Sequence, residues 1–153
     1  MSDLSHNVTF CTHLRYDSKD RLVNLQAIIN YYSKNFPNAR FIFAEDDVEH
    51  NKAFDEITWP SGRTEFYFIK NTNAYYRTRA LNYCINKAKT PIAVSLDTDC
   101  IVPVDSFNEC IKELLKDTTI AWPYNGFFID ISYGLRDLFY RSEFNYSIIK
   151  DLL

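Results

Sequence analysis

The chain has 153 residues, of which 46% are hydrophobic and 16% aromatic, and this is enough to bury the core of one ordinary domain. Its formal net charge of -3 gives no general attraction to polyanions, so we expect no nucleic-acid partner. No apolar run approaches the roughly 18 residues of a membrane span, the N-terminus lacks the apolar part of a signal peptide, and the four cysteines form no C-x-x-C pair. We therefore expect a soluble, cytoplasmic protein without a transmembrane segment, with one domain over residues 1–153.

The glycine content excludes two common nucleotide-binding loops. The three glycines, Gly62, Gly126 and Gly134, are far apart in the sequence. A G-x-G-x-x-G loop and a Walker A loop both need closely spaced glycines, so neither is present. If the protein binds a nucleotide, it does so without the glycine loops of dehydrogenases and P-loop NTPases.

The first half of the chain predicts three strands and one helix. Residues 7–12 (NVTFCT) are typical of a strand, and Asp17 or Ser18 can cap the helix that follows. Residues 40–47 (RFIFAEDD) and 64–70 (TEFYFIK) are predicted as the second and third strands. The apolar face of the helix recurs at steps of three and four residues, through Leu22, Leu25, Ile29, Tyr32 and Phe36.

The second half continues the alternation of helices and strands. We predict a helix at about residues 74–89, a strand at 92–96 (IAVSL), a helix capped by Asp105, a strand at 118–122 (TTIAW) and an amphipathic segment from 133 to the end. Continuous apolar strands separated by helices predict an α/β fold with a mainly parallel sheet and helices on both faces.

Acidic residues follow several of the predicted strands. In parallel α/β sheets, ligands bind beyond the carboxyl ends of the strands. Asp97 and Asp99 come directly after the fourth strand, and residues 12–15 and 45–47 end the first two. Two carboxylates one residue apart can converge on a hard divalent cation that keeps positions for water and phosphate oxygens. Such a pair is also common as a plain turn or helix cap, and the pattern alone leaves both interpretations open.

The stretch RTRALNYCINKAKTPIAVSLDTDC, residues 77–100, resembles the family 2 glycosyltransferases with the GT-A fold. It is particularly similar to the branch with chondroitin-polymerase-type and galactosyltransferase-type domains, whose pattern is R-x-R-A-L-N-x-G, a helix, and a hydrophobic strand into D-x-D-C. The matching residues are Arg77, Arg79, Ala80, Leu81, Asn82, Ala88, Asp97, Asp99 and Cys100, while Cys84 replaces the glycine. In element order the resemblance covers roughly residues 8–103, and it implies a GT-A, Rossmann-like sandwich.

Members of that family transfer a sugar from a nucleotide diphosphate donor, usually linked to UDP. They use Mn2+ or Mg2+ to bridge the diphosphate to the D-x-D acids. The resemblance therefore implies that Asp97 and Asp99 are metal ligands, with Asp99 the more direct one and Asp97 also able to contact the ribose. Thr98, between them, belongs to the same donor site.

The resemblance also implies nucleotide contacts at the ends of the first two strands. Arg15 matches the arginine of the family's turn after strand one, in which Thr12 replaces a proline. An acid that ends strand two commonly faces the uracil edge, and here Glu45 matches best, with Asp46 as the alternative. The plainer explanation of these acids is a charged turn that merely ends the strand. The plainer explanation of Arg15 is a solvated side chain in a loop.

Two arginines of the matched segment, Arg77 and Arg79, are expected near the nucleotide. They lie about 200° apart on a regular helix, so both can serve the site only if the helix begins near Arg79. The alternative for Arg77 is ordinary helix surface. His13 could neighbour the nucleotide, although a lone histidine beside a strand end is more often structural or solvent-facing.

The chain departs from the family pattern after Asp99. Family members continue well beyond this length and supply a catalytic base on the acceptor side, and here Asp130 is the candidate for that base. The acceptor-side portion is therefore expected to be short or missing. The apolar C-terminal helix is a candidate surface for a homo-oligomer. The sequence thus predicts transfer of a sugar to a saccharide or another hydroxyl acceptor, with a catalytically incomplete GT-A-like module for donor binding or assembly as the alternative.

Overall fold

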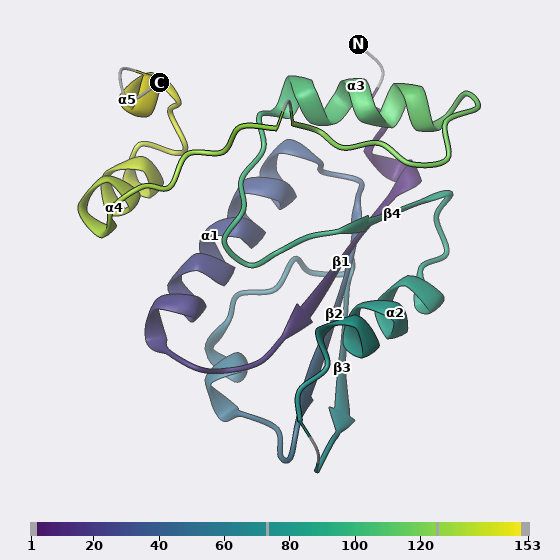
Figure 1. Ribbon diagram of the computed structural model, residues 1–153, viewed down its shortest axis with the longest axis vertical. Helices are drawn as coiled ribbons and strands as arrows, with labels where there is room; N and C mark the ends of the chain where they lie inside the picture. Colours follow the sequence, from purple (N-terminus) through teal and green to yellow (C-terminus); the bar gives the residue numbers. More distant parts are fainter. Residues whose placement is uncertain (1–2, 73, 125, 151–153) are drawn as a thin grey trace. The chain divides into compact units, whose positions relative to one another are not determined.

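A computed structural model describes residues 3–72, 74–124 and 126–150 of the chain (Figure 1). The chain forms two compact units, residues 1–101 and residues 102–153. The first unit contains the sheet and the two helices that pack on it. Among the described residues, no helix combines the length and the apolar character that a membrane crossing requires.

The sheet of the first unit is entirely parallel. Its four strands are β1 (Val8–Leu14), β2 (Arg40–Asp47), β3 (Thr64–Lys70) and β4 (Ile92–Ser95). Their order in space is β3-β2-β1-β4, so Phe10 of β1 lies between Phe41 of β2 and Val94 of β4. The chain first builds outward from β1 through β2 to β3 and then returns to place β4 on the other side of β1. The predicted parallel α/β class is therefore confirmed, and it is compatible with a Rossmann-like fold.

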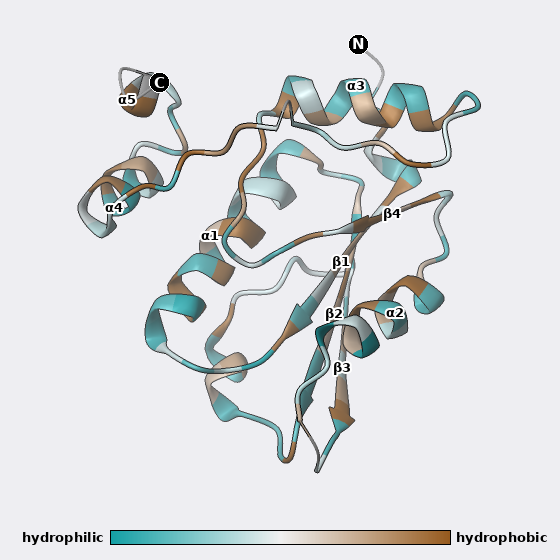
Figure 2. Cartoon of the chain, viewed as in Figure 1, coloured by the Kyte–Doolittle hydropathy of each residue, from teal (hydrophilic) through white to brown (hydrophobic). Residues whose placement is uncertain are grey.

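Helix α1 (Lys19–Asn35) covers one face of the sheet. Ser18 is its N-cap and accepts a hydrogen bond from the Arg21 backbone N–H, as predicted. Hydrophilic and hydrophobic residues alternate along the helix (Figure 2), as expected when only one side is buried. Tyr32 and Phe36 pack their rings 4.9 and 5.6 Å from the ring of Phe10. An aromatic core therefore forms between α1 and the sheet.

Helix α2 (Arg77–Lys87) covers the opposite face. Ala80 and Cys84 of this helix are fully buried and pack with Cys11, Ile42 and Ala44 of the two central strands. Successive residues of a strand point to opposite faces, so Phe10 and Cys11 contribute to different cores. The prediction of helices on both faces is confirmed. The helix begins at residue 77, about three residues later than the sequence pattern suggested.

The described residues of the first unit also form two short 3-10 helices. The short helices are η1 (Ser5–Asn7) and η2 (Lys52–Glu56). Asp105 does not cap α3 (Val104–Leu114), because the N-cap position is Pro103 and Asp105 lies in the first turn. An acid there still interacts favourably with the positive end of the helix dipole.

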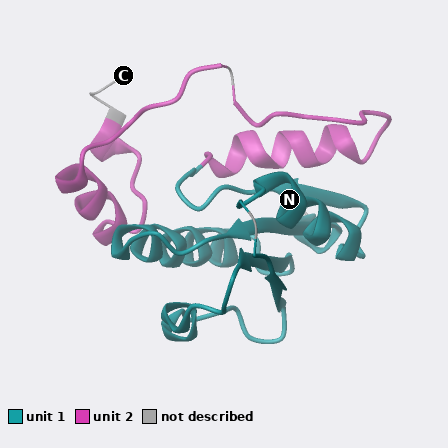
Figure 3. Cartoon of the chain, turned by 60° about the horizontal axis from the view of Figure 1, so that its bottom comes forward, with its two compact units in different colours: residues 1–101 teal, residues 102–153 magenta. Residues whose placement is uncertain are grey.

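Within its described residues, the second unit forms the helices α3, α4 (Tyr133–Arg141) and α5 (Ser147–Lys150) (Figure 3). The strand predicted at residues 118–122 is wrong, since this stretch is neither strand nor helix and Ile120 and Trp122 are more than half exposed. The predicted C-terminal amphipathic segment divides into two helices, with Glu143 and Phe144 in the left-handed region at φ 55° and 65° between them. Residues 151–153 of that segment lie outside the described residues.

Candidate functional site

The carboxyl ends of β1 and β4 lie side by side at the point where the strand order reverses. From β1 the chain proceeds through α1 to β2 on one side, whereas β4 pairs with β1 on its other side. Ligands of open α/β sheets bind outside the strand ends at such a switch point. The Leu96 N–H donates to the Cys11 carbonyl at 2.9 Å, which extends the pairing by one residue before the chain turns. Residues 97–99 and Arg15 therefore lie at the edge where a ligand is expected.

The two acids of the D-x-D motif have different surroundings. Asp97 is partly buried and accepts a hydrogen bond from Arg77 Nη2 at 2.5 Å. Asp99 is exposed, and its described polar contact is the thiol of Cys100, 3.7 Å from Oδ1. Asp97 is therefore neutralised by a guanidinium, while the carboxylate of Asp99 faces water.

Thr98 points into the protein between these two acids. Its side chain is buried, with 4% of its surface exposed, and its hydroxyl accepts a hydrogen bond from Arg21 Nη1 at 3.3 Å. Arg21 also binds the carboxylate of Asp17 through Nε at 2.9 Å, so the first turn of α1 is tied to the D-x-D turn. Nothing in the sequence pattern pointed to Arg21, because the contact joins residues 77 positions apart.

The first turn of α2 directs two arginines to two different strand ends. Arg79 binds Asp46 at the end of β2 with two parallel hydrogen bonds, of 2.9 Å from Nε and 2.5 Å from Nη2. The side chain of Asp46 has no exposed surface, whereas that of Arg79 is 42% exposed. Because the helix begins at Arg77, both guanidinium groups reach acids at this edge. The sequence condition that the helix begin near Arg79 is not met, since the helix begins two residues earlier and both arginines still reach acids at this edge.

The remaining predicted arginine, Arg15, follows β1. Its Nε lies 3.7 Å from Asp47, and its guanidinium lies over the ring of Tyr75 at 5.4 Å from the centroid. Burial raises the pKa of Tyr75 to about 12, with the Asp46 carboxylate as a second cause. Tyr75 was not identified from the sequence, since an aromatic residue just before a helix is more often part of the core.

Glu45 and Asp46 are neighbours in β2 and therefore point to opposite faces. Glu45 is fully buried on the α1 side, where Oε1 accepts the Asn51 N–H at 2.8 Å and Oε2 lies 2.5 Å from His50 Nδ1. Both carboxylate oxygens thus hold the loop that follows β2. The assignment of Glu45 to a nucleotide base stays a prediction.

β1 continues two residues beyond its predicted end, through His13 and Leu14, so Thr12, His13 and Leu14 all belong to the strand and not to the following turn. The longer strand follows from continued pairing, since Leu14 still lies opposite Glu45. The Thr12 hydroxyl and His13 Nδ1 are buried and have no hydrogen-bond partner within the described part of the chain. Burial and the charge of Arg77 lower the pKa of His13. The His13 ring lies 6.2 Å from that of Tyr75, which adds it to the α2 side of the site.

Asp130 lies in the second unit, in the connection between α3 and α4, and its side chain is exposed. This connection has no regular secondary structure over residues 118–124 and 126–132. The role of Asp130 as a catalytic base stays a prediction.

The residues at the edge provide two carboxylates for a metal ion. Over the described residues, no group of three or more His, Cys, Asp or Glu side chains is arranged to hold a metal. Mg2+ is commonly bound by one or two carboxylates together with substrate phosphates and water. Asp97 and Asp99 fit that type of site, in which part of the coordination comes from the ligand.

Neither a protein-family model nor a curated protein matches the sequence. The function of this edge therefore has to be inferred from its own residues.

Proposed function

We propose that the edge formed by β1 and β4 binds a nucleotide diphosphate sugar, and that the protein is a glycosyltransferase of the GT-A fold with a UDP-sugar as donor. The observation that carries this proposal is the position of Asp97 and Asp99 directly beyond β4, at the switch point of a parallel sheet. The resemblance of residues 77–100 to family 2 glycosyltransferases supports the same donor class.

The arginines of this edge suit a diphosphate. A guanidinium group can bind phosphate oxygens with two parallel hydrogen bonds. The pair of Arg77 and Asp97 is half exposed, so exchanging the carboxylate for a phosphate costs little. Arg79, in contrast, neutralises the buried Asp46 and is needed there. Arg77 is therefore the proposed phosphate ligand, and Arg79 holds the carboxyl end of β2 against α2.

A divalent cation, Mn2+ or Mg2+, is the proposed cofactor. When bound, it would neutralise the charge that builds up on the diphosphate leaving group. Asp99 is exposed and ready to hold it, and Asp97 becomes available when Arg77 moves to a phosphate. Thr98 and Arg21 keep the backbone of the turn in place, so the two carboxylates stay at the strand end.

The base of the nucleotide is proposed to lie beside His13, Arg15 and Tyr75. Tyr75 provides an aromatic face, and His13 Nδ1 is a buried polar atom without a partner in the described residues. In an inverting reaction one carboxylate on the acceptor side removes the proton of the acceptor hydroxyl, and Asp130 is the proposed base. The acceptor is a saccharide or another hydroxyl compound.

Calorimetric titration with UDP, in the presence and absence of Mn2+, tests this proposal. We expect binding that requires Mn2+ and that weakens at least about tenfold, or about 1.4 kcal/mol, in Asp99→Asn. Asp105→Asn removes an exposed acid that lies six residues further along the chain and has no proposed role in donor binding, so it is the matched control and should bind as the wild type does.

The proposal fails if folded wild-type protein binds neither UDP nor GDP with Mn2+, or if the two variants behave alike. Binding of GDP in place of UDP would change only the identity of the proposed nucleotide base, from uracil to guanine. Donor binding without any sugar transfer or donor hydrolysis would favour the catalytically incomplete module.

A further inference from the structure

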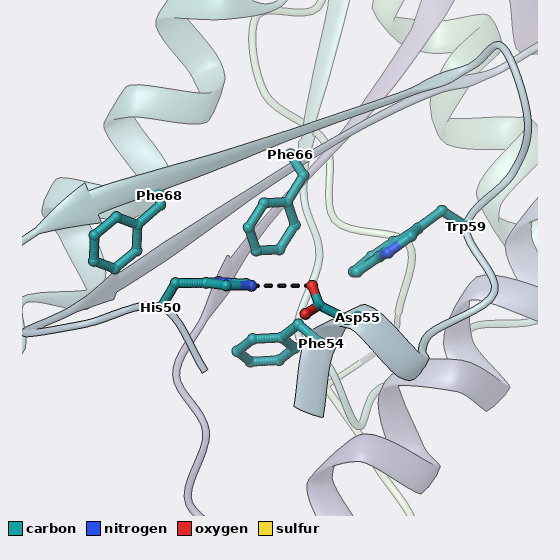
Figure 4. Close-up of a pocket in the computed structure, with 6 residues that line it drawn as sticks. All are labelled: His50, Phe54, Asp55, Trp59, Phe66 and Phe68. Atoms are coloured by element: carbon teal, nitrogen blue, oxygen red, sulfur yellow. Dashed lines mark hydrogen bonds and ion pairs between the residues drawn. The ribbon is translucent and has the colours of Figure 1, made fainter. Parts of the chain in front are cut away.

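A second candidate site lies on the other face of the sheet. It is a cleft of about 430 Å³, and we call it the aromatic cleft. Its lining residues are His50, Phe54, Asp55, Trp59, Phe66 and Phe68 (Figure 4). Phe66 lies opposite Phe43 in the sheet, and Trp59 packs on Phe43 with ring centroids 4.6 Å apart. Phe43 and Glu45 share one face of β2, so the cleft lies on the face opposite to Asp46 and Arg79.

The walls of the cleft are aromatic rings set at angles to one another. The ring of Phe66 lies 5.6 Å from Trp59 at an interplanar angle of 58°, and 6.1 Å from Phe54 at 49°. Phe68 continues the wall along β3 and is 39% exposed. The face of an aromatic ring carries partial negative charge and attracts a cation within about 6 Å of its centroid.

The charged or titratable residues of the cleft lining are His50 and Asp55. His50 lies between two carboxylates: its Nδ1 lies 2.5 Å from the buried Glu45, and its Nε2 lies 3.1 Å from Asp55, the contact drawn in Figure 4. The side chain of Asp55 is 67% exposed. No lysine or arginine lines the cleft. Two carboxylates against one imidazole leave a negative charge even when the imidazole is protonated.

The surrounding sequence strengthens this negative field. In the neighbouring segment 48–56, the exposed acids Glu49 and Glu56 add negative charge against a single lysine, Lys52. Such a field repels phosphates and other anions and raises the local concentration of cations. A small metal ion would meet aromatic carbon on most of the wall and few oxygen ligands. Alkylated ammonium groups combine a positive charge with apolar surface, and both match the cleft.

We propose that the aromatic cleft binds an organic ammonium group, with its alkyl groups against Trp59, Phe66 and Phe68 and its charge balanced by Asp55. This inference is independent of the proposed sugar transfer, because none of the six residues that line the cleft is assigned to the donor.

Choline chloride is the probe, and the fluorescence of Trp59 is the readout. The chain has two tryptophans, so the exchange Trp122→Phe leaves Trp59 as the single reporter. 3,3-Dimethylbutan-1-ol has the shape of choline without its charge, and NaCl at equal concentration controls for ionic strength. We expect saturable binding of choline in the millimolar range and at least about fivefold weaker binding of the alcohol.

Asp55→Asn keeps the shape of the cleft and removes the exposed charge. We expect choline to bind about three- to tenfold more weakly to this variant. Glu109→Gln removes an exposed acid of α3 that pairs with Lys112, and this control should bind as the parent does. Equal binding of the neutral alcohol, an unchanged affinity in Asp55→Asn, or the absence of a saturable response in folded protein would each overturn the proposal.

Discussion

Among the single residues of the protein, Asp46 carries a buried negative charge near the carboxyl end of β2. Its carboxylate has no exposed surface and is bound by both Nε and Nη2 of Arg79. Asp97, the other acid paired by α2, keeps a third of its side chain in contact with water. A buried acid that loses its partner is far more costly than an exposed one.

Arg79→Met and Arg77→Met therefore form a matched pair of variants. Arg79→Met should lower the free energy of unfolding by about 1–3 kcal/mol, because it leaves Asp46 buried without its guanidinium. Arg77→Met should lower it by less than about 1 kcal/mol, since its partner Asp97 is only partly buried and remains in contact with water. Urea denaturation measures both, and equal losses in the two variants would show that Asp46 does not depend on Arg79.

Some of these residues could be identified from the sequence and others could not. Asp97 and Asp99 were identifiable because a strand pattern ends on them, and strand ends of parallel sheets are where ligands bind. The partner of Glu45 was not, because a strand pattern does not show whether an acid faces the ligand edge or turns back to its own loop. The hydrogen bond between Arg21 and Thr98 joins the first turn of α1 to the turn after β4, and only the tertiary fold brings these two segments together.

Among the elements, β2 and the short helix η2 are linked through the imidazole of His50. His50 links the buried Glu45 of β2 to Asp55 of η2, and both hydrogen bonds raise the pKa of His50. Donation to both carboxylates at once requires the protonated ring. Above its pKa, His50 can donate to only one of them, so the link between β2 and η2 weakens.

This link predicts a pH dependence of stability with a definite sign. A raised pKa in the folded state gives a stabilisation that is complete below the unfolded value of about 6.5 and is lost as the pH rises through the folded pKa. His50→Gln should therefore reduce the fall in stability on the alkaline side of about pH 6.5. Urea midpoints measured from pH 5.5 to 8.5 test this, and an identical fall in the wild type and the variant would contradict it.

Strands with long apolar runs are the elements that the sequence predicted best. The bounds of β2 and β3 agree with the prediction, because their apolar runs are long and are bounded by turn residues. The stretch 118–122 has a similar apolar composition but is not a strand. A strand forms only where a neighbouring strand satisfies its backbone groups, and composition does not show whether one is available.

At the scale of the whole molecule, the fold class follows from the alternation of apolar strands and helices, but the strand order does not. The position of β4 beside β1 depends on pairs such as Cys11 and Ser95, which lie far apart in the sequence. That position creates the switch point, and the switch point gives the acids after β4 their proposed role. We therefore expect the nucleotide and its metal to bind at the edge of β1 and β4.

One measurement tests this location directly. Amide resonances of the protein are recorded with UDP and Mg2+, and Mg2+ is then replaced in steps by paramagnetic Mn2+, which broadens the signals of nearby residues. We expect that broadening begins at residues 97–100 and 13–15 and that it requires UDP. Broadening centred instead on the acidic loop at residues 47–56, or the same broadening without UDP, would contradict it.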